Sequence, residues 1–263
     1  MPFPLVIVDA FTDRPFEGNP AAVCLLSEPR DDEWMRRVAA EVNLSETAFL
    51  VREGDGYRLR WFTPEVEVNL CGHATLASSH VLWSEGYWPE GTPIPFQTRS
   101  GLLTAERDGD LIELDFPALP VQACSTPAGL IESLGIDPLF VGNYGMDYLC
   151  EVPDEATLRS LQPDFTKLKQ VKTRGLVVTC RASEGPYDFV SRFFAPSVGI
   201  AEDPVTGSAH CALAPYWARK LGRDDLNGYQ ASRRGGAVRV RLRGDRVRLA
   251  GQAVTVVRGM LEA

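Results

Sequence analysis

The sequence lacks a run of about 18 consecutive apolar residues, the length that a helix needs to cross a membrane. It also lacks a basic region and a cleavage signal ahead of its first apolar segment, residues 5–8. We therefore expect neither a membrane-spanning helix nor a secretory leader.

The six cysteines lack the close spacing of a disulfide framework or a metal motif. They are scattered through apolar surroundings, at positions 24, 71, 124, 150, 180 and 211. This arrangement favours reduced thiols and a cytoplasmic location. Cys71 and His73 alone form too short a motif for zinc, so we expect no metal ion.

The chain has no excess of basic charge, because its formal net charge is −8 over 263 residues. Binding to phosphates needs a basic footprint, so we expect neither nucleic acid nor a membrane surface as a partner. The basic segment 233–248 alternates with apolar residues, which is typical of strands with one solvated face. The remaining composition is globular, and the length suits one large domain or two smaller ones.

Two similar series of elements follow from the hydrophobic pattern. The first half predicts a helix that Asp31 can cap, a hairpin within 97–116, and strands at 5–10, 47–51 and 57–62. The second half predicts helices near 154–161 and 207–221, and strands near 139–142, 175–180, 187–194, 229–232, 237–242, 246–250 and 253–258. Prolines after residue 116 suggest domains 1–117 and 118–263, with the last strand, near 253–260, a candidate to cross back to the first.

Two segments of about 15 residues, 70–84 and 204–218, contain no charged residue. A surface helix needs a polar stripe, so helices in these segments should be buried on all sides. Wrapping strands around each helix is the simplest way to bury it. We therefore predict an α+β protein with two similar barrel-like domains, each a curved, mostly antiparallel sheet around a central helix. Pro215 should kink the second helix.

A repeated motif supports this duplication. The first copy reads Arg60-Trp61-Phe62-Thr63-Pro64, followed by Cys71-Gly72-His73-Ala74. The second reads Arg192-Phe193-Phe194-Ala195-Pro196, followed by Thr206-Gly207-Ser208-Ala209. Polar groups recur at the start of both helices, so we expect the functional site between the two halves.

Both predicted central helices begin at a glycine, Gly72 and Gly207. The first turn of a helix offers free N–H groups and partial positive charge, which suits a carboxylate. His73 matches Ser208 in the repeat, and Asp203 lies just before the second helix. His73 alone could be a structural histidine, but its place in a duplicated helix start favours a functional role.

Glu46 lies within the candidate segment Asn43-Leu44-Ser45-Glu46-Thr47-Ala48-Phe49, where the first helix ends and an apolar strand begins. Its carboxylate either points to solvent or lies at a sheet edge near the site. In the second case it could transfer protons to and from a substrate. His80 and His210 fall inside the buried helices and are expected to pack there.

Several motifs, in this order along most of the chain, closely resemble the PhzF-like family of phenazine-biosynthesis-type isomerases. They are Asp9-Ala10-Phe11-Thr12, Gly18-Asn19-Pro20, Asn43-Leu44-Ser45-Glu46-Thr47, Cys71-Gly72-His73-Ala74-Thr75 and Asp203-Pro204-Val205-Thr206-Gly207-Ser208. The resemblance implies a diaminopimelate epimerase-like fold with the active site in the cleft between two domains. It also implies a homodimer.

The resemblance further implies a cofactor-independent isomerase in which Glu46 is the catalytic acid/base. In the phenazine enzyme the matching glutamate moves a proton within a dihydro-hydroxyanthranilate and gives a ketone. No cofactor and no metal are implied. The positions that would surround a small carboxylated substrate are Asn19, Gly72, His73, Asp203, Gly207 and Ser208.

One departure separates the chain from two-cysteine epimerases, which place a thiol at each helix start. Cys71 fits the first place, but the second carries Asp203 and no cysteine, so inversion by a thiol pair is not expected. Two alternatives stay open. One is a one-thiol epimerase that uses Cys71, and the other is a catalytically silent protein that binds small molecules.

Overall fold

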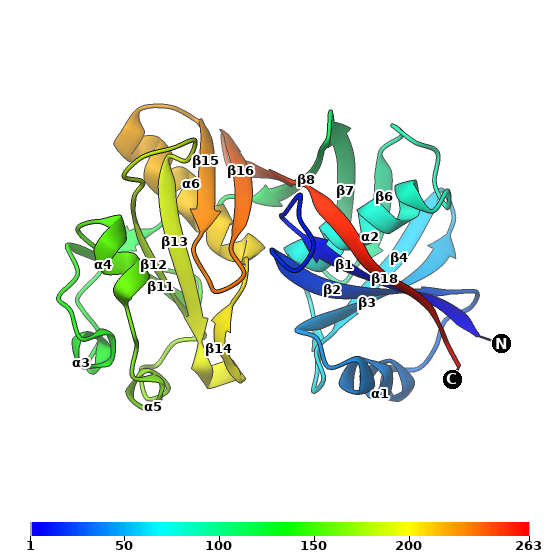
Figure 1. Ribbon diagram of the computed structural model, residues 1–263, viewed down its shortest axis with the longest axis horizontal. Coiled ribbons are helices and arrows are strands. Elements are labelled where there is room, and N and C mark those ends of the chain that lie inside the picture. The colour runs from blue at the N-terminus through cyan, green and yellow to red at the C-terminus, as the bar shows by residue number, and fades with distance from the viewer. Residues whose placement is uncertain (1, 263) are drawn as a thin grey trace. The chain divides into compact units, whose positions relative to one another are not determined.

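The computed structural model describes residues 2–262 and divides into two compact units (Figure 1). Unit 1 contains the residues up to 116 and those from 248 onward, and unit 2 contains residues 117–247. Mixed sheets with few long helices make up both units, so the predicted α+β class is correct.

The sheet of unit 1 is built around a hairpin and a parallel pair of strands. Its strands are β1(Phe3–Ala10), β2(Asn19–Leu26), β3(Glu46–Glu53), β4(Gly56–Phe62), β5(Glu67–Val68), β6(Ile94–Thr98), β7(Gly101–Asp108), β8(Leu111–Pro117) and β18(Ala253–Leu261). β18 pairs antiparallel with β1, β1 with β2, β3 with β4, and β6 with β7. The parallel pairs are β2 with β3, and β4 with β6.

Helix α1(Asp32–Val42) lies against β3 and β4, beneath β3 in the view of Figure 1. As predicted, Asp31 caps it, with its carboxylate accepting a hydrogen bond from the Trp34 backbone N–H at 2.8 Å. Met35 and Val38 are buried on the helix face that joins the core with Phe49 of β3. The amphipathic pattern thus fixes which side of this helix meets the sheet.

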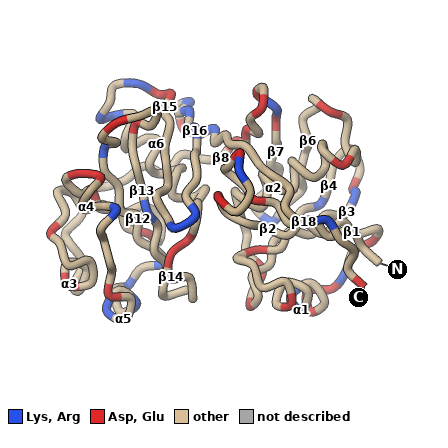
Figure 2. Tube along the Cα trace, viewed as in Figure 1, with Lys and Arg blue, Asp and Glu red and all other residues tan. Residues whose placement is uncertain are grey.

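Helix α2(Gly72–Ser84) is buried along nearly its whole length and contacts β1, β2 and β3. Figure 2 shows no charged residue on it. Its buried hydroxyls bond within the helix: Thr75 to the Cys71 carbonyl, Ser78 to Ala74 and Ser79 to Thr75. Because the polar atoms find partners one turn back, an uncharged helix can lie inside the unit without unsatisfied donors.

The strands of unit 2 repeat the pairing scheme of unit 1. They are β9(Gln122–Ala123), β10(Phe140–Tyr144), β11(Asp147–Glu151), β12(Gly175–Arg181), β13(Phe189–Ala195), β14(Ile200–Asp203), β15(Asp225–Gln230) and β16(Gly236–Arg243). β17(Arg246–Gly251) begins in unit 2 and belongs to unit 1 from residue 248 onward. β10 and β11 form a hairpin, β11 is parallel to β12, β12 antiparallel to β13, and β13 parallel to β15. The same order of antiparallel and parallel pairs runs from β1 to β6, so the duplication extends to sheet topology.

The helices of unit 2 are mostly short. They are α3(Leu130–Leu134), α4(Glu155–Ser160), α5(Phe165–Leu168), the 3₁₀ turn η1(Pro196–Val198) and α6(Gly207–Leu221). α6 spans the predicted residues, continues through Pro215 and is buried until its last turn. Its Trp217 indole N–H donates to the Thr179 hydroxyl at 3.0 Å, which ties the helix to β12. Within residues 2–262, no helix is long and apolar enough to cross a membrane.

Several strands differ from the sequence prediction, and β5, β9, β11 and β14 have no counterpart in it. β2 was not predicted, because its Gly-Asn-Pro start resembles a turn. β15 was predicted at 229–232 but lies at 225–230. The reason is Gly228, where an added Cβ would lie 2.4 Å from Phe189 Cζ, so the strand uses a residue of low β-propensity to admit a neighbouring ring.

Candidate active site

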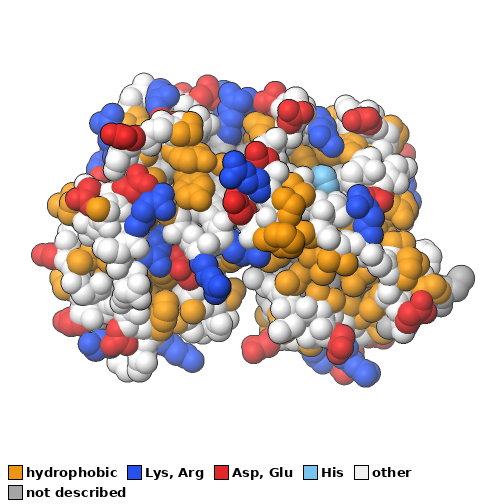
Figure 3. Space-filling model, viewed as in Figure 1, with side chains coloured by type: hydrophobic (Ala, Val, Ile, Leu, Met, Phe, Trp, Pro, Cys, Tyr) orange, Lys and Arg blue, Asp and Glu red, His pale blue; other side chains and the backbone are white. Residues whose placement is uncertain are grey.

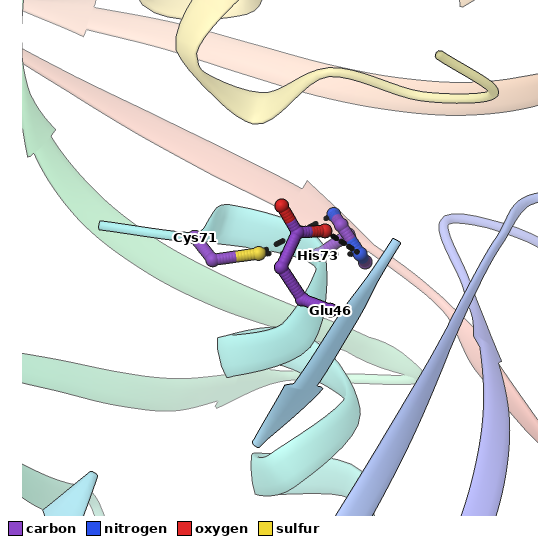
Figure 4. Close-up of side chains that lie close together, drawn as sticks. All are labelled: Glu46, Cys71 and His73. Carbon is purple, nitrogen blue, oxygen red and sulfur yellow. Dashed lines mark hydrogen bonds and ion pairs between the residues drawn. The ribbon is translucent and has the colours of Figure 1, made fainter. Parts of the chain in front are cut away.

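Glu46 and His73 meet at the start of α2. Glu46 is the first residue of β3 and His73 the second residue of α2, and Glu46 Oε2 lies 3.2 Å from His73 Nε2 (Figure 4). Only 14% of the Glu46 side chain and 6% of the His73 side chain are exposed. The pair is therefore shielded from bulk water but open at the carboxylate.

Cys71 lies beside both His73 and Glu46. It is the N-cap residue of α2, yet its side chain makes no capping hydrogen bond. Instead, its Sγ lies 3.5 Å from His73 Nδ1, as Figure 4 shows. The sequence analysis placed Cys71 at the first helix start, as the thiol of the epimerase alternative, and did not predict its contact with His73.

Asn19 completes this group from the start of β2. It is fully buried, and its amide nitrogen lies 3.3 Å from His73 Nδ1. An amide can donate through its nitrogen to a neutral ring or accept through its oxygen from a protonated one. Either way Asn19 fixes the plane of the imidazole, which keeps Nε2 facing Glu46.

The surroundings of His73 favour its protonated form. Burial alone would lower the pKa of His73, but hydrogen bonds to Cys71 and Glu46, together with the charge of the Glu46 carboxylate, raise the pKa well above its usual value. Burial, followed by the Glu46 charge, raises the pKa of the Cys71 thiol. Near neutral pH we therefore describe the group as an imidazolium beside a neutral thiol.

The start of α6 in unit 2 carries a different polar group. Asp203, at the end of β14, is 8% exposed and accepts a hydrogen bond from the Thr206 hydroxyl. Gln230 of β15 joins both, because its Nε2 donates to the Asp203 carbonyl at 2.7 Å and its Oε1 accepts from Thr206 N–H at 2.9 Å. These bonds hold the segment before Gly207 in place.

Ser208, which matches His73 in the repeat, contacts an arginine. Arg174, the residue before β12, donates from Nη2 to Ser208 Oγ at 3.3 Å. The same guanidinium makes a two-point contact with the Asp147 carboxylate, whose Oδ1 accepts from Nε at 2.8 Å. The start of α6 therefore carries a hydroxyl and a guanidinium where α2 carries an imidazole and a carboxylate.

The repeated arginines brace both helix starts in the same way. Arg60 of β4 binds the Glu67 carboxylate of β5 through two nitrogens, with Nε to Oε1 at 2.8 Å. Arg192 of β13 binds Glu202 of β14 likewise, at 2.7 and 3.0 Å. Each pair ties the strand of the motif to the short strand that leads into the helix. The arginine of the repeated motif thus has a structural role in both units.

The structure brings together the predicted residues within each unit. Asn19, Glu46, Gly72 and His73 gather at the start of α2. Asp203, Gly207 and Ser208 gather at the start of α6. The sequence prediction missed Thr206, Gln230, Arg174 and Asp147 as members of the second group. Gln230 and Arg174 lie 24 and 34 residues from their partners, so no local pattern marks them.

Glu46, Cys71 and His73 each offer a ligand atom, and these atoms lie within 4.8 Å of one another. A carboxylate, a thiol and an imidazole are all groups that bind zinc. Metal binding would require the Cys71 thiol to lose its proton, and its raised pKa opposes this. The expectation of metal-free chemistry therefore needs a direct test.

Comparison with known proteins gives a consistent result. The family model described as phenazine biosynthesis-like protein, PhzC-PhzF, matches residues 8–259. An uncharacterized isomerase from Halalkalibacterium halodurans is 55% identical over 262 residues, which are 99% of each chain. The match thus extends over nearly the whole sequence.

Solved structures extend this result to the fold. A phenazine biosynthesis protein of the PhzF family from Enterococcus faecalis superposes with a TM-score of 0.95 at 39% identity, over 100% of both chains. A predicted epimerase from Pseudomonas aeruginosa, at 21% identity, reaches a TM-score of 0.75 over 99% of both chains. The expected epimerase-like fold is therefore confirmed.

Proposed function

The chain belongs to the phenazine biosynthesis-like family, an isomerase and epimerase type, and on that premise we propose the reaction that it catalyses. We propose that this isomerase moves a proton within a small carboxylated substrate, without a cofactor, and that Glu46 is its acid/base. The observation that carries the proposal is the shielded carboxylate of Glu46, 3.2 Å from His73 Nε2.

In the proposed reaction the Glu46 carboxylate takes a proton from a substrate carbon, and the electron pair left behind spreads into the conjugated system. The carboxylic acid so formed returns the proton to another carbon of the same system. One group can perform both steps while water is excluded, because the proton stays on Glu46 in between. The imidazolium of His73 stabilises negative charge on Glu46 or on the substrate.

The alternative of a one-thiol epimerase has less support. A thiol whose pKa is raised by burial holds its proton and is a weak base near neutral pH. Cys71 touches the His73 ring, so it could still orient the imidazole. Under the proposal, Cys71→Ala keeps most of the activity, whereas a catalytic thiol would make that variant inactive.

Other expectations from the sequence stay predictions. The substrate is expected in the cleft between the two units, where both helix starts would bind it. The enzyme is expected to be a cytoplasmic homodimer. Hydrophobic side chains gather over β2 and β18 in the view of Figure 3, and Val257 and Met260 of β18 are 49% and 53% exposed. Sedimentation equilibrium would measure the assembly state directly.

Proton NMR in D₂O tests the proposal, with dihydro-3-hydroxyanthranilate and related amino-diene carboxylates as probes. Wild type should convert a probe or exchange one of its carbon-bound protons, and Glu46→Gln should lose this by roughly 10²–10⁴-fold. Glu53→Gln, at the other end of β3, removes an exposed carboxylate and should keep full activity. Dialysis against EDTA should leave the rate unchanged.

Full activity of Glu46→Gln on an identified substrate would exclude Glu46 as the acid/base. Loss of activity on EDTA treatment, with recovery on adding zinc, would contradict the metal-free mechanism. Binding of the probes without any exchange would favour the catalytically silent alternative.

A further inference from the structure

The strand registers show which position of unit 2 corresponds to Glu46. In unit 1, Ala21 of β2 lies opposite Glu46 of β3. Three residues further along β3, Phe49 lies opposite Arg60, the first residue of the repeated motif. Two criteria thus define the position of Glu46 in the sheet. It lies three residues before the residue that pairs with Arg60, and it pairs with Ala21 of the parallel strand β2.

The same two criteria select Gly175 in unit 2. Asp147 of β11 lies opposite Gly175 of β12. Three residues further along β12, Val178 lies opposite Arg192, the matching arginine. Gly175 therefore occupies the position of Glu46, and Asp147 occupies that of the apolar Ala21.

No side chain fits at Gly175. A Cβ there would lie 2.2 Å from Cζ of Phe193, which is far inside van der Waals contact. The obstacle is a buried aromatic ring on the neighbouring strand and not the free end of a flexible chain. Unit 2 therefore has no room for a second acid/base at the place equivalent to Glu46.

The adjacent residue, Arg174, supplies a side chain to the start of α6. Its Nη2 lies 3.3 Å from the Oγ of Ser208, the residue that matches His73. The carboxylate–imidazole pair of one unit thus has a guanidinium–hydroxyl pair as its counterpart in the other. A ligand at this place would thus meet N–H and O–H donors, on a guanidinium whose charge the Asp147 carboxylate balances.

Arg174 is held in a fixed position without being covered. The nearly buried Asp147 accepts from its Nε at 2.8 Å and also from Nη2, while the Arg174 backbone N–H donates to the Met146 carbonyl at 2.9 Å. The Ser197 hydroxyl donates to the Arg174 carbonyl at 3.0 Å. The side chain remains 38% exposed, and among residues 2–262 its Nη1 has no hydrogen-bond partner.

We infer that Arg174 and Ser208 form the subsite that binds the carboxylate of the substrate. The carboxylate would accept hydrogen bonds from Arg174 Nη1 and from the Ser208 hydroxyl. Because Ser208 Oγ already accepts from Nη2, its hydrogen points away from the guanidinium and is available to the ligand. This inference rests on the proposed function for the presence of a carboxylate, and it assigns a residue that the sequence motifs do not include.

The affinity for the anion comes from fixed donors and not from net charge, since Asp147 neutralises Arg174. Arginine held by a carboxylate loses little side-chain freedom when a ligand binds, which favours affinity. The subsite should therefore discriminate a carboxylate from the uncharged amide of the same shape. A charged hydrogen bond contributes enough to give roughly tenfold or greater preference.

Isothermal titration calorimetry with anthranilate and anthranilamide tests this, because the two probes differ only in carboxylate and carboxamide. Wild type should bind anthranilate at least about tenfold more tightly. Arg174→Gln should bring the ratio of the two affinities close to one, and Arg174→Lys should keep part of it. Arg181→Gln, at the exposed far end of β12, removes the same charge and should keep the full ratio.

Removing Arg174 leaves Asp147 as an unpaired buried carboxylate, which could unfold the variant. The double variant Arg174→Gln with Asp147→Asn avoids that charge and should show the same loss of preference. An unchanged ratio in a folded Arg174 variant would overturn the inference. So would wild type that shows no preference for anthranilate, including wild type that binds neither probe.

The glutamate variant separates this inference from the proposed function. Glu46→Gln should lose proton exchange but keep the preference for anthranilate, because the subsite belongs to unit 2. If Glu46→Gln stayed active while Arg174→Gln lost the preference, the proposed acid/base would be wrong and the anion subsite right.

Discussion

The starts of α2 and α6 have the same backbone arrangement but different side chains. Both helices begin at a glycine after a short strand that an arginine–glutamate pair holds in place. At α2 the second residue, His73, meets the Glu46 carboxylate, whereas at α6 the second residue, Ser208, meets the Arg174 guanidinium. The duplicated scaffold therefore fixes where functional groups stand, while single side chains decide what each group does.

The difference between the two places has a steric origin. Phe193 fills the space next to Gly175, so a Cβ at that position would lie 2.2 Å from its Cζ, whereas the matching position of unit 1 carries the side chain of Glu46. A protein with two such carboxylates could protonate opposite faces of a substrate. A single carboxylate, Glu46 of unit 1, agrees with the proposed transfer of a proton by one group.

The largest expected effect concerns the second residue of each helix. His73→Gln should lower kcat by roughly 10²-fold, because it removes the partner 3.2 Å from the carboxylate of Glu46, the proposed acid/base. Ser208→Ala should instead raise KM by about tenfold with little change in kcat, because it removes a binding hydrogen bond. Steady-state kinetics measure both. His80→Gln, on the same helix as His73, is the control, and equal kcat losses at positions 73 and 208 would contradict the division of roles.

An intermediate effect is expected on stability. Gly175→Ala should lower the free energy of unfolding by about 1–3 kcal/mol, because the added methyl group must displace the Phe193 ring. Gly259→Ala is the matched control, since the nearest atom to its new Cβ, Leu5 O, is 4.0 Å away. Urea unfolding of both variants measures the difference. Equal midpoints would show that unit 2 can admit a side chain at this place.

The smallest expected effect needs no substitution and is seen in the titration of the histidines. Burial lowers the pKa of His73, but its interactions with Cys71 and Glu46 outweigh this effect and raise the pKa. The pKa of His210, one turn into α6, is lowered to about 4, chiefly because burial disfavours its charged form. The imidazole NMR signals should therefore titrate above pH 6.5 for His73 and near pH 4 for His210.

The two histidines should affect stability in opposite ways. The contribution of His73 is present below pH 6.5, where it is also protonated when unfolded, and is lost as the pH rises through its folded pKa. That of His210 is present above pH 6.5 and is lost as the pH falls toward 4. Urea denaturation at pH values from 4 to 9 measures the free energy of unfolding, which should fall at both the acid end and the alkaline end of this range. In the variant His73→Gln the loss of stability at alkaline pH should disappear, whereas the loss at acid pH should remain.

Sequence patterns predicted the elements that depend on local chemistry. The Asp31 cap and the apolar stripe predicted α1, and the uncharged segment after Gly207 predicted α6. β2 was missed because the Gly-Asn-Pro sequence at its start is typical of a turn, and the start of β15 was misplaced because Gly228 serves a close contact with Phe189 of the neighbouring strand. Propensity gives no signal for such a contact.

The residues of the candidate site also fall into two groups, those that the sequence identified and those that only the structure revealed. Glu46, His73, Asp203 and Ser208 stand in or beside recognisable motifs at strand and helix starts, so the sequence alone identified them. Gln230 and Arg174 carry no motif, because their partners lie far along the chain and meet them only through the sheet. Their membership depends on strand register, which places distant residues side by side.

The sequence by itself determined that the chain is duplicated, that each half contains a buried uncharged helix, and that polar residues mark both helix starts. The hydrophobic pattern of each segment and the repeated motif can be read from the sequence directly, without knowing which distant residues come into contact. Only the tertiary structure decided that Glu46 lies against His73 while Gly175 is closed by Phe193 and Arg174 reaches Ser208. The physical reason is steric: which side chain fits beside a strand depends on the ring that the next strand presents.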